Sequence, residues 1–472
     1  MLRSVSLTPT VVQGGARLAE LKALQPTWHK VFAAASRDQA WMNDVFGPMA
    51  AKCAWTAQEL AVYNRVHARL LEKPTLLLPN AVYLKTGPDA YALGVCNVQA
   101  GEPYQVQLVH DYQAASVTVG TLEGGPLAAV TAALARAARL VHPAHPVVAI
   151  LSKPAATLAL RTKADVVGVA ARLKAVEGVA TVLYVSMADL AQATLDRDNH
   201  LVLGEHKISV IYSRYDFSHP SGSFVGPAAL SKGGGAAQHS SSPADPAKWA
   251  GEWAAVERME QSTCVVSSSL GSRLANRRAV QHALATTPGA VARFLPSSSD
   301  EATEAAAFRA VLPEQWALGG GDVASLRAMV EADPGGFVAK NVLRPRTGSD
   351  KTQNRLASGG ALVSGAAGLR ALFEADGTTG EVAGRHHVLF RKIALQRHDA
   401  EIAHDGEVHA LPGGATSEVC TYGAYLADHH NAVLESRVVG VGVRTKPADA
   451  HHPLTQALGY GAVSCCLVVP GK

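Results

Sequence analysis

The sequence predicts a protein of the α/β class, and three patterns along the chain carry this prediction. Apolar residues recur at spacings of three and four through residues 19–72, as they do in amphipathic helices. Strand-like and helix-like segments then alternate between residues 125 and 214, as in a mainly parallel sheet covered by helices. From residue 337 onward β-type runs dominate, so a second unit rich in strands is expected.

The individual elements follow from these patterns. Short apolar runs separated by turn residues, including TLLLP at 75–79 and YQVQLV at 104–109, predict strands after the first helices. An alanine-rich helix is expected at 125–141. The Gly-Glu pair at 204–205 lies between two β-type runs and predicts a hairpin. Asp322, which follows three glycines, is interpreted as the N-cap of a helix with a buried apolar stripe.

Length and composition indicate a large folded protein. The chain has 472 residues, of which 48% are hydrophobic and 17% are charged, so it can bury a large core and lacks the composition of a disordered chain. This length suits two or three packed units, or one large intertwined α/β body. The formal net charge is +4, without a dense block of lysine and arginine, which argues against direct nucleic acid binding.

Cysteine usage and hydropathy argue against further classes. The six cysteines contain no C-x-x-C pair, so neither a zinc site nor a disulfide framework is indicated, and a reducing compartment fits best. No apolar run approaches the roughly 18 residues that a transmembrane helix needs. We therefore expect no transmembrane span.

The first residues have the composition of a mitochondrial targeting segment. They carry Arg3, Arg17 and Lys22, with serine and threonine between them and no acidic residue before Glu20, a pattern typical of such segments. We predict a mitochondrial location from this pattern. The alternatives are a targeting segment that is not cleaved and a plain cytoplasmic protein.

Residues 337–354, FVAKNVLRPRTGSDKTQN, begin like a phosphate-binding loop but lack its main features. A β-type run delivers Lys340 into a polar loop. A loop that wraps phosphate needs several glycines, and a metal that rides on the phosphates needs a nearby carboxylate. This loop has one glycine, Gly348, and the charged residue four positions after Lys340 is Arg344. It is therefore either a nucleotide site or the remnant of one.

Several motifs together carry a family resemblance. Those in the C-terminal third are FVAK at 337–340, VLFRKI at 388–393, SEVCTYGAYL at 417–426 and VRTK at 443–446. Three upstream segments extend the match: HDYQAASVTVGTL at 110–122, ISVIYSRYDF at 208–217 and LANRRAVQHAL at 274–284. In this order and spacing the motifs resemble those of eukaryotic glutathione synthetase, a member of the ATP-grasp enzymes. The resemblance spans roughly residues 75–470.

The resemblance implies an ATP-grasp-like α/β fold with an N-terminal helical layer and a C-terminal, mainly antiparallel sheet with a lid. The family joins γ-glutamylcysteine to glycine through an acyl phosphate that is made from ATP and stabilised by two magnesium ions. Such chemistry depends on positioning and charge neutralisation, so the metal ligands and the phosphate loop are indispensable.

The patterns and the resemblance together predict that the chain is divided into four regions, one of which contains an insertion. A stretch rich in glycine, serine and proline at 218–247 has the composition of a flexible insertion. The predicted division is a candidate targeting segment at 1–20, N-terminal helices and first strands of the ATP-grasp body at 21–144, a substrate-type α/β subdomain with the insertion at 145–290, and an ATP-grasp and lid region at 291–472.

The metal-binding positions implied by the resemblance are degraded in this chain. Where the family has a glutamate and, two residues on, an asparagine, this sequence has Asp111 and Gln113. Both retain oxygen ligands, but their changed lengths suit octahedral Mg²⁺ poorly. Arg344 replaces the other metal carboxylate and would repel the cation. The family's glycine-rich loop reads PRTGS at 345–349 here, so most of its capacity to wrap phosphate is lost.

The residues that contact nucleotide and substrate in the family are retained in this chain better than the metal-binding residues. Arg214 and Arg444 could also be merely solvated or ion-paired at strand ends, and this alternative stays open. The vestigial nucleotide-binding positions implied by the resemblance are Arg278, Lys340, Lys392 and Glu418, and the vestigial substrate-binding positions are Ser116, Arg214, Arg444 and Lys446.

These losses predict a pseudoenzyme with a glutathione synthetase-like fold and no confidently assigned catalytic residue. We expect no required cofactor, and an accessory structural role in a large mitochondrial assembly such as a respiratory complex or mitoribosome, with protein subunits as partners. The alternative is an active, divergent ATP-dependent glutathione synthetase, which would use magnesium and ATP. A free homodimer is the alternative to the larger assembly.

Overall fold

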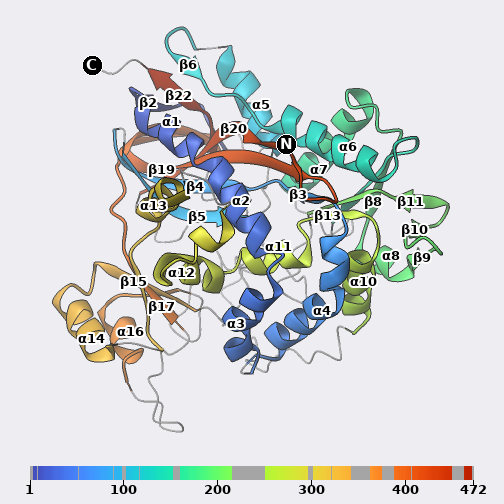
Figure 1. Ribbon diagram of the computed structural model, residues 1–472. Helices are drawn as coiled ribbons and strands as arrows, with labels where there is room; N and C mark the ends of the chain where they lie inside the picture. The colour runs from blue at the N-terminus through green and yellow to red at the C-terminus, as the bar shows by residue number, and fades with distance from the viewer. Residues whose placement is uncertain are drawn as a thin grey trace, which may run out of the picture.

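The computed structural model describes most of the chain (Figure 1). The described residues are 4–7, 9–51, 53–88, 90–97, 103–115, 117–152, 160–214, 250–295, 301–319, 322–341, 362–374, 387–404, 407–448 and 462–469. The predicted insertion at 218–247 and the loop after Lys340 lie outside these residues.

An eight-stranded, mostly antiparallel sheet forms the centre of the fold and joins both ends of the chain. Its longest strands, β19 and β20, pair from Ala415–Pro447 to Ala427–Val433. Strand β1 pairs with β18 in antiparallel and with β21 in parallel orientation, so residues near the N-terminus complete the sheet. The order is β18 (His398–His404), β1 (Ser4–Ser6), β21 (Ala462–Ser464), β20 (Val433–Pro447), β19 (Glu407–Ala427), β4 (Asn80–Gly87) and β5 (Ala90–Asn97), with β3 (Thr75–Leu77) also paired to β19.

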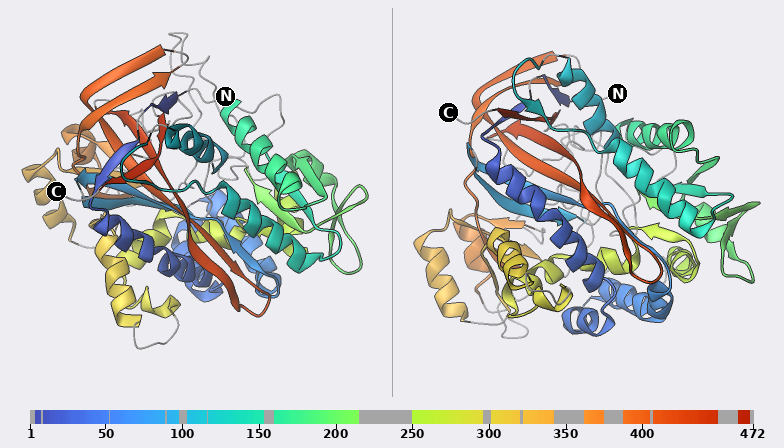
Figure 2. Two further views of the ribbon diagram at one scale, coloured as in Figure 1. Left: turned by 90° about the horizontal axis from the view of Figure 1, so that it is seen from above. Right: turned by 45° about the horizontal axis from the view of Figure 1, so that its top comes forward.

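Helices cover both faces of the central sheet (Figure 2). On one face, α1 (Ala16–Ala23) and α2 (Gln25–Ala35) pack against Val419 and Val443 of the two long strands. On the other face, α5 (Pro103–Ala114) places Val106 and Val109 against Cys420 and Tyr422. Because side chains alternate along a strand, neighbouring residues of β19 belong to different cores.

The helical layer near the N-terminus matches the predicted amphipathic pattern. Helices α3 (Gln39–Ala50) and α4 (Ala54–Leu71) pack against each other, and the Asp38 side chain caps α3 by accepting a hydrogen bond from Trp41 N. The two large apolar side chains Phe46 and Tyr63 are fully buried. Helices α11 (Leu270–Ala275), α12 (Arg278–Thr286), α13 (Glu301–Val311) and the 3₁₀ helix η2 (Ala292–Phe294) join this core.

A second, four-stranded parallel sheet confirms the alternation of strands and helices predicted between 125 and 214. Helices α6 (Leu127–Val141) and α7 (Leu160–Ala175) share an apolar core with Val148, Ile150 and Tyr212 of this sheet. The Gly204–Glu205 turn forms the predicted hairpin. The strands are β13 (Val265–Ser267), β12 (Val210–Ser213), β7 (Val147–Leu151) and β8 (Thr181–Val185), and further elements here are α8 (Met187–Gln192), β9 (Thr194–Leu195), β10 (Leu201–Leu203), β11 (His206–Ile208) and α10 (Ala250–Gln261).

A small antiparallel sheet with two helices forms a separate lobe, at lower left in Figure 1. Asp322 caps its helix α14, as predicted, by accepting a hydrogen bond from Ser325 N at 3.0 Å. Phe337, Ala339 and Leu389 pack under the helices. The strands are β14 (Gln315–Ala317), β17 (His387–Arg391), β15 (Phe337–Asn341) and β16 (Leu362–Ser364), and the helices are α14 (Val323–Ala332) and α16 (Ala366–Ala371).

The strands after residue 337 therefore divide between two sheets. Strands β15 to β17 belong to the lobe, whereas β18 to β21 belong to the central sheet. A further sheet of β2 (Thr10–Gln13), β22 (Cys466–Val469) and β6 (Thr121–Leu122) again joins the two chain ends. Residues 1–20, the candidate targeting segment, thus contribute β1, β2 and the start of α1.

The strand predicted at 104–109 is wrong, because these residues form α5. The sequence YQVQLV alternates apolar and polar residues, as a strand does. However, the residues that α5 buries include Val106, Val109 and Gln113, at spacings of three and four, and packing of this helical stripe on the central sheet decides the conformation. In the part of the chain that the structure describes, no helix has the length and hydropathy of a membrane span.

Candidate ligand-binding site

One face of the central sheet carries a charged row across its two longest strands. Glu418 of β19 and Arg444 of β20 are direct cross-strand partners, and Lys446 pairs with Thr416 two residues along. Directly opposed residues of an antiparallel pair project from the same face. Arg444 also lies opposite Val463, which packs with Val106 and Val109. The charged row therefore lies on the face that α5 covers.

Helix α5 carries both predicted metal-binding residues, but it holds Gln113 inside the protein. The Gln113 side chain is fully buried. Its Oε1 accepts a hydrogen bond from Cys465 N at 2.9 Å, and its Nε2 donates one to Ser6 O at 2.8 Å. The amide thus pairs with backbone groups at the junction of β1 and β21.

Asp111 lies in a different environment from Gln113. Its side chain is 62% exposed, and its Oδ1 accepts a hydrogen bond from Gln107 Nε2 at 2.8 Å. Burial, and secondarily the negative charge of Asp111, raises the pKa of the Cys465 thiol to about 12. Residues i and i+2 of a helix do not face each other, so α5 turns the two predicted ligands to different sides. The structure does not bring Asp111 and Gln113 together.

Arg214 forms an ion pair with a buried carboxylate. It directly follows β12, and its Nη2 lies 3.1 Å from Asp165 Oδ2 of α7. The other oxygen, Asp165 Oδ1, accepts a hydrogen bond from Tyr104 N in the first turn of α5 at 2.9 Å. Seven residues of helix, about 10 Å, separate Tyr104 from Asp111. Helix α5 therefore meets Asp165 at its first turn and packs on the face of the central sheet that carries the charged row.

Two of the four predicted nucleotide-side residues, Lys340 and Lys392, lie in the lobe, whereas Arg278 is on α12 and Glu418 is on β19. Lys340 is on β15, and its Nζ lies 4.8 Å from the ring centroid of Phe390 on the neighbouring strand β17. Lys392, just after β17, is exposed, and its backbone N–H bonds to Gly336 O. Arg278, the first residue of α12, is half-buried. A lysine over an aromatic ring is a favourable cation–π arrangement.

A short connection leads from the lobe to the charged row. Strand β17 ends at Arg391, and the backbone N–H of Gln396 bonds to Lys85 O of β4. Leu84, next to Lys85, is the cross-strand partner of Glu418. Five residues span at most about 18 Å. Lys392 of the lobe therefore lies no more than about 18 Å from β4, the strand that pairs with β19 at Glu418.

Two predicted positions cannot be placed in this arrangement. Ser116, on the substrate side, and Arg344, at the lost metal carboxylate, lie outside the described residues. The same holds for the phosphate-type loop PRTGS at 345–349. Their assignments stay predictions from the resemblance.

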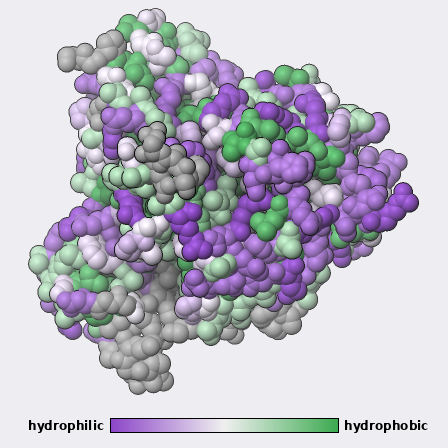
Figure 3. All heavy atoms as spheres, viewed as in Figure 1, coloured by the Kyte–Doolittle hydropathy of each residue, from purple (hydrophilic) through white to green (hydrophobic). Residues whose placement is uncertain are grey.

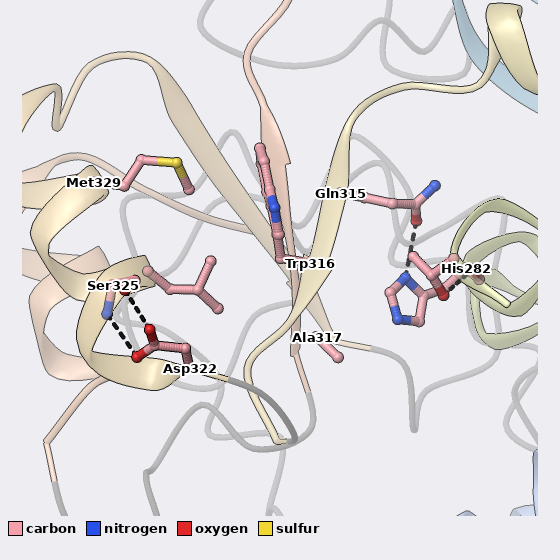
Figure 4. Close-up of a pocket in the computed structure, with 9 residues that line it drawn as sticks. His282, Gln315, Trp316, Ala317, Asp322, Ser325 and Met329 are labelled. Carbon is pink, nitrogen blue, oxygen red and sulfur yellow. Dashed lines mark hydrogen bonds between the residues drawn. The ribbon is translucent and has the colours of Figure 1, made fainter. Parts of the chain in front are cut away.

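A pocket of about 530 Å³ opens beside β14, between the lobe and α12 (Figure 4). Trp316 and Met329 supply apolar lining, and His282 and Asp322 supply polar atoms. Burial lowers the pKa of His282, so this side chain is neutral at pH 7, and its Nδ1 lies 3.3 Å from Gln315 Oε1. The Asp322 carboxylate is already used to cap α14. None of the predicted site residues lines this pocket.

One cluster has the composition of a metal site but already contains a cation. Ligand atoms of Asp196, Asp198 and His200 lie within 4.8 Å of one another. The Lys207 ammonium is 2.7 Å from Asp196 Oδ2, and this contact is the main cause of the lowered pKa of Asp196. Lys207 therefore supplies the positive charge that a metal would bring.

Comparisons with known proteins support the fold alone. The chain is similar to a solved structure described as a glutathione synthetase like-effector from Globodera pallida in apoform, with a TM-score of 0.65 and 13% sequence identity over 99% of this chain and 91% of that chain. A putative gamma-glutamylcysteine synthetase from Methylobacillus flagellatus gives a TM-score of 0.42 and 12% identity, over 88% of this chain and 87% of that one. No family model matches the sequence, and no curated protein matches it.

The protein therefore shares its mixed α/β architecture with a glutathione synthetase-like protein. The first comparison covers 99% of this chain and 91% of the other, so the two folds are similar over most of their lengths. This agrees with the ATP-grasp-like architecture expected from the sequence motifs.

Sequence reasoning missed two residues of this site. Asp165 is fully buried on the apolar stripe of α7 that includes Val169 and Leu173. A lone aspartate on such a stripe can be recognised from the sequence and predicts a buried ion pair, because buried charges need partners. Phe390 belongs to the VLFRKI strand motif, and no sequence signal marks it as the ring next to Lys340.

Proposed function

We propose that this protein binds a small anionic peptide of the γ-glutamyl type at Arg214, Arg444 and Lys446, and does not ligate it. The observation that supports this proposal most directly is the position of Gln113. Its amide is buried and bonded to two backbone groups, while Asp111 is exposed on another side of the same helix.

The cationic residues suit a peptide with carboxylates. Guanidinium groups pair with carboxylates through parallel hydrogen bonds, and such charge-assisted bonds are among the strongest in proteins. Arg444 lies opposite Glu418, and Lys446, two residues further along β20, projects from the same face of the sheet. Arg214 lies at the carboxyl end of a strand in a parallel sheet, where α/β proteins commonly bind ligands. These positions favour binding of a ligand such as glutathione.

The described residues at the predicted metal positions do not fit the two-metal arrangement of the resembled enzymes. Mg²⁺ requires near-octahedral oxygen ligands at close to ideal distances, and Gln113 offers no accessible oxygen. Asp111 alone would leave the ion held mainly by water. We therefore propose that the protein needs no metal or nucleotide, although Arg278, Lys340, Lys392 and Glu418 remain the residues that would contact ATP if it bound.

Isothermal titration with glutathione, in the absence of nucleotide and magnesium, tests the proposal. We expect saturable binding by the wild-type protein and at least about tenfold weaker binding by Arg444→Ala, because a hydrogen bond to a charged group is lost. Arg437→Ala is the matched control, since Arg437 lies on the same strand but is exposed and paired with Glu435. Absence of binding by the wild-type protein, or equal loss in both variants, would reject the proposal.

A second proposal concerns the assembly in which the protein acts. An apolar patch surrounded by hydrophilic residues lies near α6 on the face seen in Figure 3, and Leu140 of α6 is 41% exposed. Such patches mark contact surfaces. A contact surface suits the predicted accessory subunit, whose mitochondrial location rests on the composition of residues 1–20 alone, and native-size fractionation of mitochondrial and cytosolic extracts tests the proposal. Comigration with a very large complex is the expected result, whereas a free dimer peak would contradict it.

A further inference from the structure

We infer that Asp165 is a positioning residue that couples the Arg214 guanidinium to the amino end of α5. This inference rests on the proposed function in one respect, namely that Arg214 contacts the ligand. Asp165 itself is fully buried and is not proposed to touch the ligand. It acts through the two groups that its carboxylate holds.

The carboxylate divides its two oxygens between different parts of the fold. Oδ2 lies 3.1 Å from Arg214 Nη2, and Oδ1 accepts the Tyr104 N–H at 2.9 Å. The first backbone N–H groups of a helix have no partner within the helix, and the helix dipole favours a negative charge there. The single negative charge of Asp165 thus neutralises the Arg214 guanidinium and also accepts a hydrogen bond from a backbone N–H at the amino end of α5.

The surrounding packing holds this arrangement in place. Arg214 is only 13% exposed at its side chain, and its backbone N–H bonds to Leu151 O of the adjacent strand. Its positive charge also lies near Tyr212, whose pKa is raised mainly by burial. On α7, Gly168 lies so close to the Tyr104 ring that a β-carbon there would overlap it. The first turn of α5 is therefore seated directly on α7.

This arrangement has a consequence for ligand binding. A guanidinium has five N–H donors, so it can serve Asp165 and an incoming carboxylate at once. Arg214 fixed by Asp165 is ordered before the ligand arrives, which lowers the entropic cost of binding. Because Asp165 also holds α5, which packs on the face of the central sheet that carries Arg444 and Lys446, the two parts of the proposed site are linked through one carboxylate.

The first test is a double-mutant cycle on glutathione affinity. Asp165→Asn should weaken binding about tenfold or more in the wild-type background. In an Arg214→Ala background the same change should cost clearly less affinity, because only the effect of Asp165 through α5 remains. Asp165→Glu should restore part of the affinity. Equal losses in both backgrounds, or no loss at all, would overturn the inference.

A buried carboxylate elsewhere provides the matched control. Glu260 is fully buried and pairs with Lys73 at 3.6 Å, so Glu260→Gln removes a similar charge without touching Arg214 or α5. It should leave glutathione affinity within about twofold. If Glu260→Gln weakens binding as much as Asp165→Asn, general destabilisation explains the loss and the inference fails.

A measurement without ligand separates this inference from the proposed function. Amide hydrogen exchange of the first turn of α5 should accelerate in Asp165→Asn and also in Arg214→Ala, although Arg214 is not the acceptor for Tyr104 N. Lys73→Ala should leave this turn unchanged. If Arg214→Ala has no effect there, the coupling is absent whatever the ligand. If the exchange result holds but glutathione does not bind, only the proposed function is rejected.

Discussion

The side-chain carbonyl of Gln113 accepts a hydrogen bond from the backbone N–H of Cys465 at 2.9 Å. This contact fixes the C-terminal half of α5 to the strand junction at Cys465, and the amide of the same side chain reaches Ser6 O. A residue that the family resemblance assigns to metal binding thus has a structural role here. That role has a measurable consequence.

Gln113→Leu is expected to destabilise the protein without changing any effect of magnesium. The variant removes the hydrogen bonds that Gln113 makes to Ser6 O and Cys465 N, and loss of a buried partner costs about 1–3 kcal/mol for each group left unsatisfied. Urea unfolding measures the loss. Asp111→Asn is the control: it removes an exposed charge and should change the free energy of unfolding by less than about 0.5 kcal/mol. Magnesium-dependent stabilisation that disappears in Asp111→Asn would instead identify a metal ligand.

The buried histidine of α2 should make stability depend on pH. Gln25 Oε1 accepts a hydrogen bond from Thr421, which turns the Gln25 amide toward His29 Nε2. His29 Nδ1 then donates to Ser436 Oγ. A proton on Nε2 would face a donor, and burial lowers the pKa of His29 from 6.5 to about 3. His29 is therefore neutral in the folded state near pH 7.

The sign of the effect follows from these two pKa values. Between pH 6.5 and about 3 the unfolded chain protonates His29 but the folded protein does not. Stability should fall as the pH decreases through this window, with a contribution of about 1.4 kcal/mol per pH unit from this group. Urea unfolding at pH 7, 6 and 5 should show a shallower slope for His29→Gln. His142 and His282, whose pKa values burial also lowers, act in the same direction in both proteins. Equal slopes would contradict this account.

Gly168→Ala should be destabilising because the added methyl group overlaps the Tyr104 ring. Either the ring or α5 must shift, and overpacking of this kind costs about 1–3 kcal/mol. The control is Gly251→Ala in α10, where a β-carbon would meet no atom within 4 Å. That variant should gain up to about 1 kcal/mol, since glycine weakens a helix relative to alanine. Thermal unfolding distinguishes the opposite signs, and two changes of the same sign would refute the packing argument.

The buried thiols should be unreactive in the folded protein. Burial raises the pKa of Cys465 and of Cys466 to about 12, and the thiolate is the form that reacts with alkylating agents. A short iodoacetamide pulse at pH 8, followed by peptide mass spectrometry, should modify these residues only after unfolding. Cys53, which is partly exposed, should react first. Modification of Cys466 at the rate of Cys53 would indicate that this end of the sheet opens.

The sequence predicts much of the fold because the patterns of its long elements agree with their packing. Helices α6 and α7 have apolar stripes of helical spacing, and the hairpin at Gly204 has a clear turn signal. Helix α5 could not be predicted in this way, because its short alternating segment fits a strand equally well. Only the packing of this segment on the central sheet decides between a helix and a strand.

The same ambiguity limited the prediction of the site. On a strand, residues at i and i+2 share a face, and Asp111 and Gln113 would then lie together; on α5 they do not. Glu418 and Arg444 are 26 positions apart in the sequence, and only the register of the β19–β20 hairpin shows that they are partners. The ion pair of Arg214 with Asp165 depends on the seating of α7 against the parallel sheet, which no local motif encodes.

The central claim is that the glutathione synthetase-like fold binds its ligand without ligating it. The most direct test incubates the purified protein with γ-glutamylcysteine, glycine, magnesium and ATP, and quantifies glutathione and ADP over time by mass spectrometry. With transition-state charge left uncompensated by metal, the rate should fall by several orders of magnitude, to the level of a reaction without protein. ATP-dependent formation of glutathione at a rate within about a hundredfold of an ordinary ligase would contradict the account.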